Sequence, residues 1–287
     1  MKKSRQPHYL ARIARKLRFF RGFPGWHRII TWLVPAHDCD FCIRNSDTLF
    51  CGNIESYIDS QIYLFGGYEQ NLIKTFLNEI PADRRGKVLD IGANVGNHSL
   101  EFSRAFNSVE SFEPNPMLWA QFEKNIKLNN IMNVNLHKVG LSDFDSELIL
   151  YMIDKPNHGL GTFSTVEQYD LPIKATSKCT VRNGSKFLSD IGVGLVDAVK
   201  IDVQGFEPEV MKGLYEVLLR DKPIIWFEIG EGTIKKIDTY SKLKNFIPFD
   251  FRLFRMDEKL KMTKSIVNLI ECTGSLISSD YLIIPIR

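Results

Sequence analysis

The sequence lacks long hydrophobic runs, internal repeats and low-complexity tracts. Its longest apolar run near the N-terminus, Ile29 to Val34, is far shorter than the roughly 20 residues that a membrane-spanning helix needs. A cleavable signal peptide needs a continuous hydrophobic core, and Lys16, Arg18 and Arg21 interrupt it here. The sequence therefore predicts neither a transmembrane helix nor a secretory leader.

Cysteine is scarce and odd in number, at positions Cys39, Cys42, Cys51, Cys179 and Cys272. Five cysteines in 287 residues do not suggest a disulfide framework, which favours a reducing cytoplasm. Three of them, with His37, offer zinc ligands within a short stretch, but no second close pair follows at the spacing of a zinc finger. We therefore expect a cytoplasmic protein without a metal ion.

Acidic residues are absent from positions 1–37, which hold nine Lys and Arg. The remainder has 28 Lys and Arg against 34 Asp and Glu, so the basic character belongs to the N-terminus alone. The spacing predicts a basic amphipathic helix with an apolar face of Leu10, Ile13, Leu17 and Phe20 and a basic face of Arg12, Arg15, Lys16 and Arg18. Three roles stay open: peripheral contact with the inner face of a membrane, packing on the domain, and, least favoured, contact with nucleic acid.

The most informative stretch is residues 87–114, which predicts a strand, a glycine turn, a helix and a second strand. The apolar run around Leu89 is too short for a helix, and Gly92 and Gly96 break it. Ligands of an open parallel sheet bind at the carboxyl ends of strands where the strand order reverses. We expect Asp90, Gly92 and Glu113 at that edge, where they form a nucleoside-cofactor site.

The spacing of the glycines distinguishes between cofactors. A dinucleotide fingerprint requires glycine at positions 92, 94 and 97, but this chain has Gly92, Asn94 and Asn97, so two of the three glycines are missing. The pattern Asp-x-Gly-x-x-x-Gly instead resembles the first motif of class I S-adenosylmethionine (SAM) methyltransferases. SAM offers a sulfonium cation and a ribose diol, and Glu113 is suited to accept hydrogen bonds from both ribose hydroxyls.

Strands and helices alternate along the rest of the chain, which predicts a three-layer α/β fold. We expect a Rossmann-like sheet that is mostly parallel with an antiparallel edge, following an N-terminal extension over residues 1–60. The expected further strands are 134–139, 147–152 (an edge strand), 196–203, 224–229, 249–255 and 281–285, and the expected helices are 72–77, 115–128, 207–220 and 234–246. The loop 155–165 is expected at the substrate mouth.

The chain resembles the FkbM family of SAM-dependent methyltransferases over residues 61–287. The resemblance rests on VLDIGANVGNHS, SFEPNP, the Asn125 to Asn129 region, GLSD, and above all VKIDVQGFE followed by WFEIG. It implies transfer of a methyl group to a hydroxyl of a sugar, polysaccharide precursor or secondary metabolite. The implied cofactor contacts are Asp90, Gly92, Asn94 and Gly96 for the methionine end, Glu113 for the ribose, and Ser142 and Asp143 for the adenine. Ala93 and Pro114 are also expected to contact the cofactor, and Glu69 is expected to close the cleft from the N-terminal side.

A neutral hydroxyl is a weak nucleophile, so the reaction benefits from a general base. Asp202 is the first candidate, followed by Glu207, Glu228 and His98. Each has an alternative role: Asp202 and Glu207 as substrate-orienting or helix-capping groups, His98 as a packed side chain, and Glu69 as a solvated carboxylate at a helix start. The family often has Glu where this chain has Gln204, which cannot accept a proton.

Four rival functions remain. A nicotinamide dehydrogenase is disfavoured by Asn94 and Asn97, and a nucleic-acid methyltransferase, which the basic arm would help, by the absence of an Asn/Asp-Pro-Pro-aromatic turn at residues 202–205. A Mg²⁺-dependent enzyme would use clustered acids such as Asp202 and Glu228. A non-catalytic SAM-binding protein is the alternative that Gln204 raises.

Overall fold

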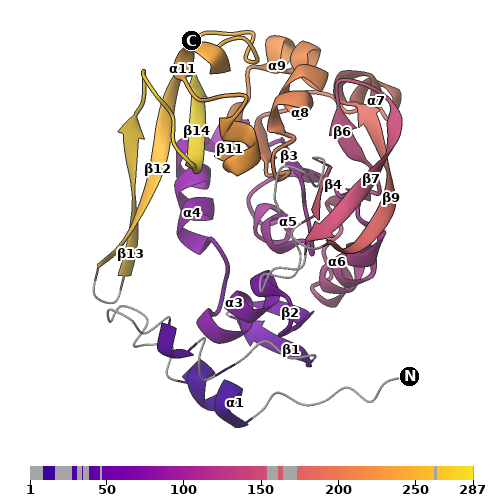
Figure 1. The fold of residues 1–287 in the computed structure, drawn as a ribbon, viewed down its shortest axis with the longest axis vertical. Helices are drawn as coiled ribbons and strands as arrows, with labels where there is room; N and C mark the ends of the chain where they lie inside the picture. The colour runs from indigo at the N-terminus through magenta and orange to yellow at the C-terminus, as the bar shows by residue number, and fades with distance from the viewer. Residues whose placement is uncertain are drawn as a thin grey trace.

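The structure is a computed structural model that describes residues 9–16, 28–30, 34, 39–45, 47–153, 161–163, 173–261 and 264–286. Eight strands form its main sheet in the order β13-β12-β14-β11-β10-β3-β4-β5 (Figure 1). Their bounds are β3 (Lys87–Ile91), β4 (Ser108–Phe112), β5 (Val134–His137), β10 (Ala198–Ile201), β11 (Ile224–Ile229), β12 (Phe251–Lys261), β13 (Lys264–Glu271) and β14 (Ser279–Pro285).

Strand direction places the ligand edge of this sheet. Strands β11, β10, β3, β4 and β5 run parallel, whereas β14 pairs antiparallel with both β11 and β12. The chain passes from β3 outward to β4 and β5, then returns to β10 on the other side of β3. The strand order therefore reverses at β3, and a crevice forms beside its carboxyl end.

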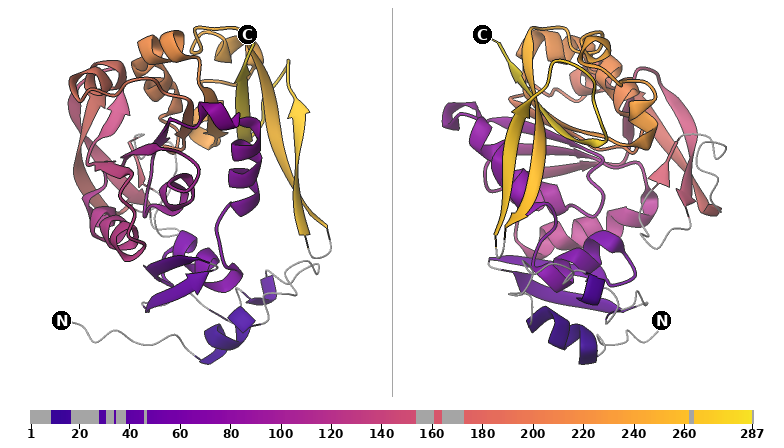
Figure 2. Two further views of the ribbon diagram at one scale, coloured as in Figure 1. Left: turned by 180° about the vertical axis from the view of Figure 1, so that it is seen from behind. Right: turned by 60° about the vertical axis from the view of Figure 1, so that its left-hand side comes forward.

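Alternate residues of the parallel strands pack on opposite faces of the sheet, as the period of two along a strand requires. Leu89 and Phe227 belong to the core beneath α7 (Gly184–Asp190), α8 (Glu207–Gly213) and α9 (Tyr215–Asp221). Val88 and Trp226 belong to the core beneath α4 (Gln70–Glu79) and α5 (Asn97–Phe102). Helices cover both faces (Figure 2), so the predicted three-layer Rossmann-like α/β fold is confirmed.

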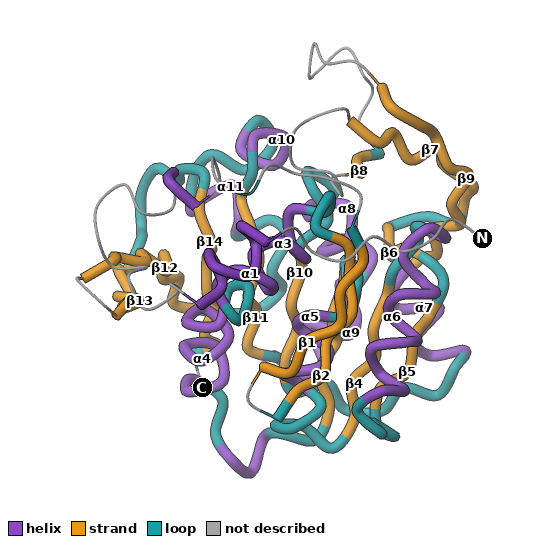
Figure 3. The backbone as a smooth tube through the Cα atoms, turned by 90° about the horizontal axis from the view of Figure 1, so that it is seen from below, coloured by secondary structure: helices purple, strands orange, loops and turns teal. Residues whose placement is uncertain are grey.

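A third core lies below the sheet and contains buried apolar residues of the N-terminal segment. It is built from α1 (Tyr9–Lys16), the hairpin of β1 (Asp40–Asn45) and β2 (Thr48–Asn53), and α3 (Tyr57–Phe65), against α6 (Pro116–Leu128). Viewed from below, the hairpin projects in front of the middle of the main sheet (Figure 3), and its β2 strand packs on α6. Asn125 of α6 and Asn129, which follows the helix as its C-cap, fix it there, because they accept hydrogen bonds from the backbone N–H groups of Cys51 and Leu49 at 2.9 and 2.8 Å.

Of the predicted apolar face of helix α1, the structure describes only the side chain of Ile13. Ala11 and Ala14 are buried, Ile13 is only half-buried, and the Arg15 guanidinium lies 5.5 Å above the Tyr63 ring. The helix packs on α3 because the two alanines allow a close approach, which is the second of the three roles left open. Positions 17 and 20, and the side chain of Leu10, lie outside what the structure describes.

The cysteine expectation was wrong in one respect. Cys42 and Cys51 face each other across the β1–β2 hairpin with their Cα atoms 4.0 Å apart, and they form a disulfide. Directly opposed residues of an antiparallel pair come this close at non-hydrogen-bonded positions. The disulfide removes both sulfurs from the zinc ligand set that we weighed.

Four expectations about secondary structure also need correction. The strand 147–152 is β7 (Ser146–Ile153) of a separate sheet, ordered β6-β9-β7-β8, with β6 (Gly140–Ser142), β8 (Gly161–Thr162) and the unforeseen β9 (Ile173–Asn183). The helix 207–220 breaks at Leu214 into α8 and α9. The helix 234–246 is two single turns, α10 (Glu231–Ile234) and α11 (Tyr240–Leu243). The antiparallel edge of the main sheet is β13, which we did not predict, and the opposite edge is β5.

Among the described residues, no helix is both long and apolar enough to cross a membrane.

Candidate active site

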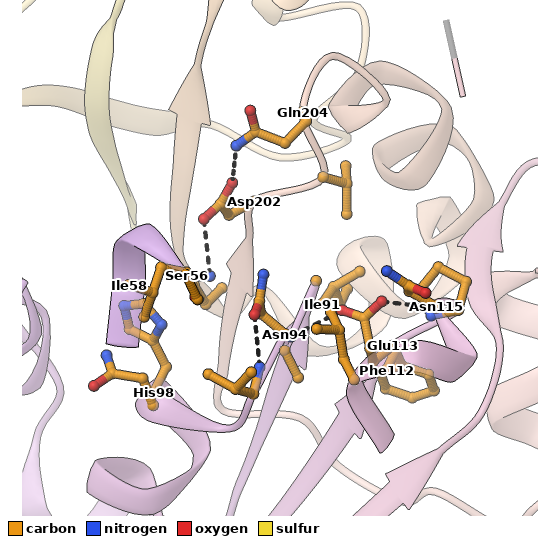
Figure 4. Close-up of a pocket in the computed structure, with 18 of the residues that line it drawn as sticks. Ser56, Ile58, Ile91, Asn94, His98, Phe112, Glu113, Asn115, Asp202 and Gln204 are labelled. Atoms are coloured by element: carbon orange, nitrogen blue, oxygen red, sulfur yellow. Dashed lines mark hydrogen bonds and ion pairs between the residues drawn. The ribbon is translucent and has the colours of Figure 1, made fainter. Parts of the chain in front are cut away.

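A cavity of about 630 Å³ opens at the carboxyl ends of β3, β4, β10 and β11. This volume lies within the range of about 300–1,000 Å³ that is typical of small-molecule sites. Nine of the predicted site residues line it: Glu69, Gly92, Ala93, Asn94, His98, Glu113, Pro114, Asp202 and Glu228. Figure 4 shows several of them converging from different elements.

The glycine turn after β3 is fixed by a close approach of two strands. Gly92 has φ of +82°, and a Cβ there would lie 1.9 Å from the carbonyl oxygen of Asp202. The N–H groups of Gly92 and Ala93 donate to the Phe112 carbonyl at 3.0 and 3.1 Å, and that of Asn94 donates to Glu113 Oε2 at 2.8 Å. None of these three amides is free to bind a pyrophosphate, so the turn does not suit a dinucleotide.

Glu113 lies at the end of β4 with its carboxylate held by backbone groups. Besides the Asn94 bond, its Oε1 accepts from the N–H of Asn115 at 2.8 Å. Asn115 is also the N-cap of α6, where its side chain accepts from the N–H of Met117 at 3.1 Å. Burial raises the pKa of Glu113 to about 7 although both backbone bonds oppose this. The carboxylate is therefore oriented by the fold and poised to pair with a hydroxyl or a cation.

A second group of carboxyls surrounds Lys200, which is only 2% exposed. Its Nζ lies 3.3 Å from Asp202 Oδ2 and 3.9 Å from Asp90 Oδ1. Burial alone would lower the pKa of Lys200, but the Asp202 and Asp90 carboxylates outweigh it, so that pKa is raised. Burial likewise tends to raise the pKa of Asp202, but Lys200 holds it below its usual value. Asp202 is therefore ionised at neutral pH.

Gln204 joins two of these carboxyls. Its side-chain amide donates to Asp202 Oδ1 at 2.9 Å and to Glu228 Oε2 at 3.1 Å. Its backbone has φ of +54°, in the left-handed region that non-glycine residues rarely adopt. The charge of Asp202 and burial raise the pKa of Glu228 to about 10, so Glu228 holds a proton beside the ionised Asp202.

His98 and Glu69 face each other from α5 and the start of α4. His98 Nε2 lies 3.0 Å from Glu69 Oε2. Burial, and then the charge of Lys200, lower the pKa of His98 to about 3, so the pair is a hydrogen bond of a neutral imidazole rather than an ion pair. Burial and the charge of Asp202 raise the pKa of Glu69 to about 7, while the Tyr68 hydroxyl donates to it.

Five predicted site residues do not line the cavity: Asp90, Gly96, Ser142, Asp143 and Glu207. Asp90 is buried behind the turn and accepts from Ser99 Oγ at 2.6 Å. Gly96 faces the Phe122 ring, which a Cβ would approach to 3.0 Å. Ser142 and Asp143 do not line the cavity, but the two residues that precede them, Gly140 and Leu141, do.

Glu207 holds the turn after β10 together instead of facing the cavity. Its carboxylate accepts from the N–H groups of Val203 and Gly205 at 3.0 Å each and from the Thr233 hydroxyl. These contacts brace the turn before α8 and are not the helix cap that we weighed, because both N–H donors precede the helix and its N-cap residue Phe206 makes no side-chain cap bond. We do not retain Glu207 as a candidate base.

Several lining residues were not foreseen. They include Asn53, the stretch Glu55 to Asp59, Asn97, Asn115, Met117, Leu118, Gln121, Lys200, Phe206 and Asp280. Lys200 carried a signal, because a lone charge inside an otherwise apolar strand needs a buried partner. The N-terminal stretch carried none, since only the docked hairpin brings it to the cavity. Of the predicted mouth loop 155–165, only 161–163 are described, and Phe163 lines the cavity.

The sequence profile described as "Methyltransferase FkbM domain" matches residues 90–253, which is more than half of the chain. The chain belongs to the FkbM methyltransferase family. Its cofactor is S-adenosylmethionine, as for class I methyltransferases generally. The cavity of this FkbM chain fits that cofactor: it offers buried carboxylates to a ribose diol and a sulfonium, and its turn amides are already bonded.

Two relatives that are named as methyltransferases are similar in sequence to this chain over part of their length. "Methyltransferase 1" of Beauveria bassiana is 29% identical over 148 residues, which is 44% of this chain and 57% of the relative. "Hexuronic acid methyltransferase AglP" of Haloferax volcanii is 29% identical over 150 residues, 52% of this chain and 58% of the relative. The chain therefore matches less than two thirds of either relative.

Among solved structures, "Methyltransferase FkbM" from Methylobacillus flagellatus KT has a TM-score of 0.45 and 14% identity. The similarity covers 78% of this chain and 52% of that one.

Proposed function

We propose that this FkbM chain is an O-methyltransferase that methylates a hydroxyl of a sugar, a polysaccharide precursor or a secondary metabolite. The observation that carries the proposal is the cluster of carboxyl side chains around Lys200. This cluster and Glu113, the expected ribose ligand, lie in the same cavity. The name of the Haloferax relative supports a sugar derivative as the acceptor class. When bound, SAM supplies an electrophilic methyl group; the chain must hold the acceptor oxygen in line and take its proton.

Two carboxylates compete for the role of base. Asp202 is ionised and its side chain is 27% exposed, so it accepts a hydrogen bond from an incoming hydroxyl at once. Its low pKa, however, makes it a weak base. Glu69 is 21% exposed at its side chain and has a pKa of about 7, near the value that favours general-base catalysis. His98 is disfavoured by its low pKa, and Glu228 because it already holds a proton.

The pH–rate profile of kcat/KM separates these two candidates. If Asp202 takes the proton, the rate is flat around pH 7 and falls only in the acid range below its depressed pKa. If Glu69 takes it, the rate rises with pH between about 6 and 8. The Glu69→Gln variant should abolish the rise in rate between about pH 6 and 8 and leave the fall in the acid range unchanged.

Oxygen is favoured over nitrogen as the acceptor atom. The negative charge of Asp202, which contributes to the raised pKa values of Glu228 and Glu69, would also favour the protonated form of an amine. A protonated amine has no lone pair with which to attack a methyl group, whereas a hydroxyl keeps its lone pairs. The cavity thus supports hydroxyl transfer even though Gln204 replaces a carboxylate.

Gln204 favours an active enzyme over a non-catalytic SAM-binding protein. The hydrogen bonds donated by its side-chain amide hold Asp202 and Glu228 side by side. A third carboxylate at position 204 would repel both of them. We infer that Gln204 positions these carboxyls and takes no proton itself.

The proposal is tested by calorimetric titration with SAM, S-adenosylhomocysteine and NAD, followed by transfer of a labelled methyl group from SAM to a panel of glycosides. We expect micromolar binding of both adenosyl ligands, no binding of NAD, and an alkali-stable methyl ether in the product. Binding of NAD alone would refute the cofactor assignment, and product methylated on nitrogen would refute the acceptor atom.

A further inference from the structure

The cavity carries far more acidic than basic side chains. Its acids are Glu55, Asp59, Glu69, Glu113, Asp202, Glu228 and Asp280. Among the lining residues that the structure describes, Lys200 is the only Lys or Arg, and Asp202 already pairs with it. Burial, and then the charges of Glu69 and Asp202, raise the pKa of Asp280 to about 7, so part of this rise comes from the excess of negative charge. The sulfonium of the cofactor offsets only part of it.

Two phenylalanines lie in the same cavity as this acidic group. The ring centroids of Phe163 and Phe206 are 5.4 Å apart, with the planes inclined by 60°. Both side chains line the cavity and are half-buried. Phe206 lies four residues after Asp202, at the end of the short turn that connects β10 to α8. The rings therefore give the acceptor an apolar surface beside hydrogen-bond acceptors.

We propose that the acceptor is an uncharged ring that bears several hydroxyls, and that the Phe163–Phe206 pair and the carboxylates of Glu69 and Asp202 select it over an acidic sugar. This inference rests on the proposed O-methyl transfer. Carboxylates accept hydrogen bonds from hydroxyls, and an aromatic face packs against the C–H side of a sugar ring or carbocycle. A uronate would bring a further negative charge into a field that only Lys200 opposes among the described lining residues.

The test compares pairs of methyl glycosides that differ only at C6, which is a hydroxymethyl group in one member and a carboxylate in the other. Glucose, galactose and mannose pairs are assayed for labelled methyl transfer from SAM, with S-adenosylhomocysteine binding measured in parallel. We expect kcat/KM to favour the neutral member about tenfold or more, with the preference increasing from pH 6 to pH 8 as Glu69 and Asp280 ionise.

Equal or faster transfer to the uronate overturns this inference and leaves O-methyl transfer standing. Adenosyl binding with no transfer to either member of any pair overturns both. The two failures are thus distinguished within one experiment.

A matched pair of variants tests the aromatic surface. Phe206→Leu should raise the KM of the accepted glycoside about tenfold while the S-adenosylhomocysteine Kd stays within about twofold. Phe144 is the control, because its ring lies 6.5 Å from that of Phe206 but does not line the cavity. Phe144→Leu should change neither constant. An unchanged KM for the glycoside in Phe206→Leu would contradict a role of this ring in selecting the acceptor.

Discussion

Replacing Lys200 by Met provides a severe test of the charge arrangement in this site. Lys200 is the cation that lies nearest two carboxylates, Asp202 at 3.3 Å and Asp90 at 3.9 Å, and Asp90 Oδ1 accepts no hydrogen bond within the described structure. Met fills a similar volume, so the substitution removes charge with little change in packing. It leaves two neighbouring carboxylates without their counter-ion.

The expected loss of stability follows from burial. Removing one partner of a buried ion pair costs about 3–5 kcal/mol, because the remaining charge stays desolvated. Asp90 is fully buried, whereas the Asp202 side chain is 27% exposed and partly screened by solvent. We therefore expect the free energy of unfolding to fall by about 2–4 kcal/mol, which corresponds to a lower Tm by about 5–15 °C.

The loss should depend on pH with a definite sign. Without Lys200, burial raises the folded-state pKa of Asp202 above its unfolded value of about 4. A carboxyl with a raised folded pKa is tolerated while it is protonated and destabilises the fold as pH rises through that pKa. The difference in stability between wild type and variant, measured by urea unfolding, should therefore be smaller at pH 5 than at pH 8.

Lys138 is a matched control. It pairs with Glu123 at 2.7 Å and lies 5.2 Å from the Trp119 ring, much as Lys200 pairs with Asp202 and lies 6.0 Å from the Trp226 ring. Its side chain is 45% exposed, so Lys138→Met should cost less than about 1 kcal/mol at either pH. Equal losses in the two variants, or a Lys200→Met loss that does not vary with pH, would refute the reasoning.

Four further outcomes are expected. Glu113→Ala should weaken S-adenosylhomocysteine binding about 10- to 100-fold by calorimetry with an unchanged circular dichroism spectrum; unchanged affinity would exclude Glu113 from the ribose site. Asp202→Asn should lower kcat about 100-fold with SAM affinity within about twofold, and a wild-type rate would remove it as base. Gln204→Glu should shift the acid limb of the pH–rate profile upward, because a third carboxylate raises the pKa of its neighbours; an unshifted limb contradicts the bridging role. Cys42→Ala should lower stability by at most about 3 kcal/mol, and dithiothreitol should then lower the Tm of wild type but not of the variant.

Much of the fold could be predicted because local patterns and tertiary packing agree in the parallel half of the sheet. The apolar run at β3 is buried on both faces, so it reads as a strand without reference to its neighbours. The glycines at positions 92 and 96 both have positive φ, which a side chain would oppose. The C-terminal half was harder: β9 has few apolar residues, β13 leaves Ile266 and Ile270 exposed, and short helices such as α10 have too few residues for a periodic signal.

The sequence by itself determined the family, the strand–turn–helix at the cofactor end, and the positions of Glu113 and Asp202 after their strands. Tertiary structure alone decided which carboxyls share a cavity and in which protonation state. Asp280 lies beside Glu228 only because β14 inserts antiparallel next to β11. The N-terminal stretch reaches the cavity only because Asn125 and Asn129 hold the hairpin on α6. Burial and distance set a pKa, and neither can be read from the order of residues along the chain.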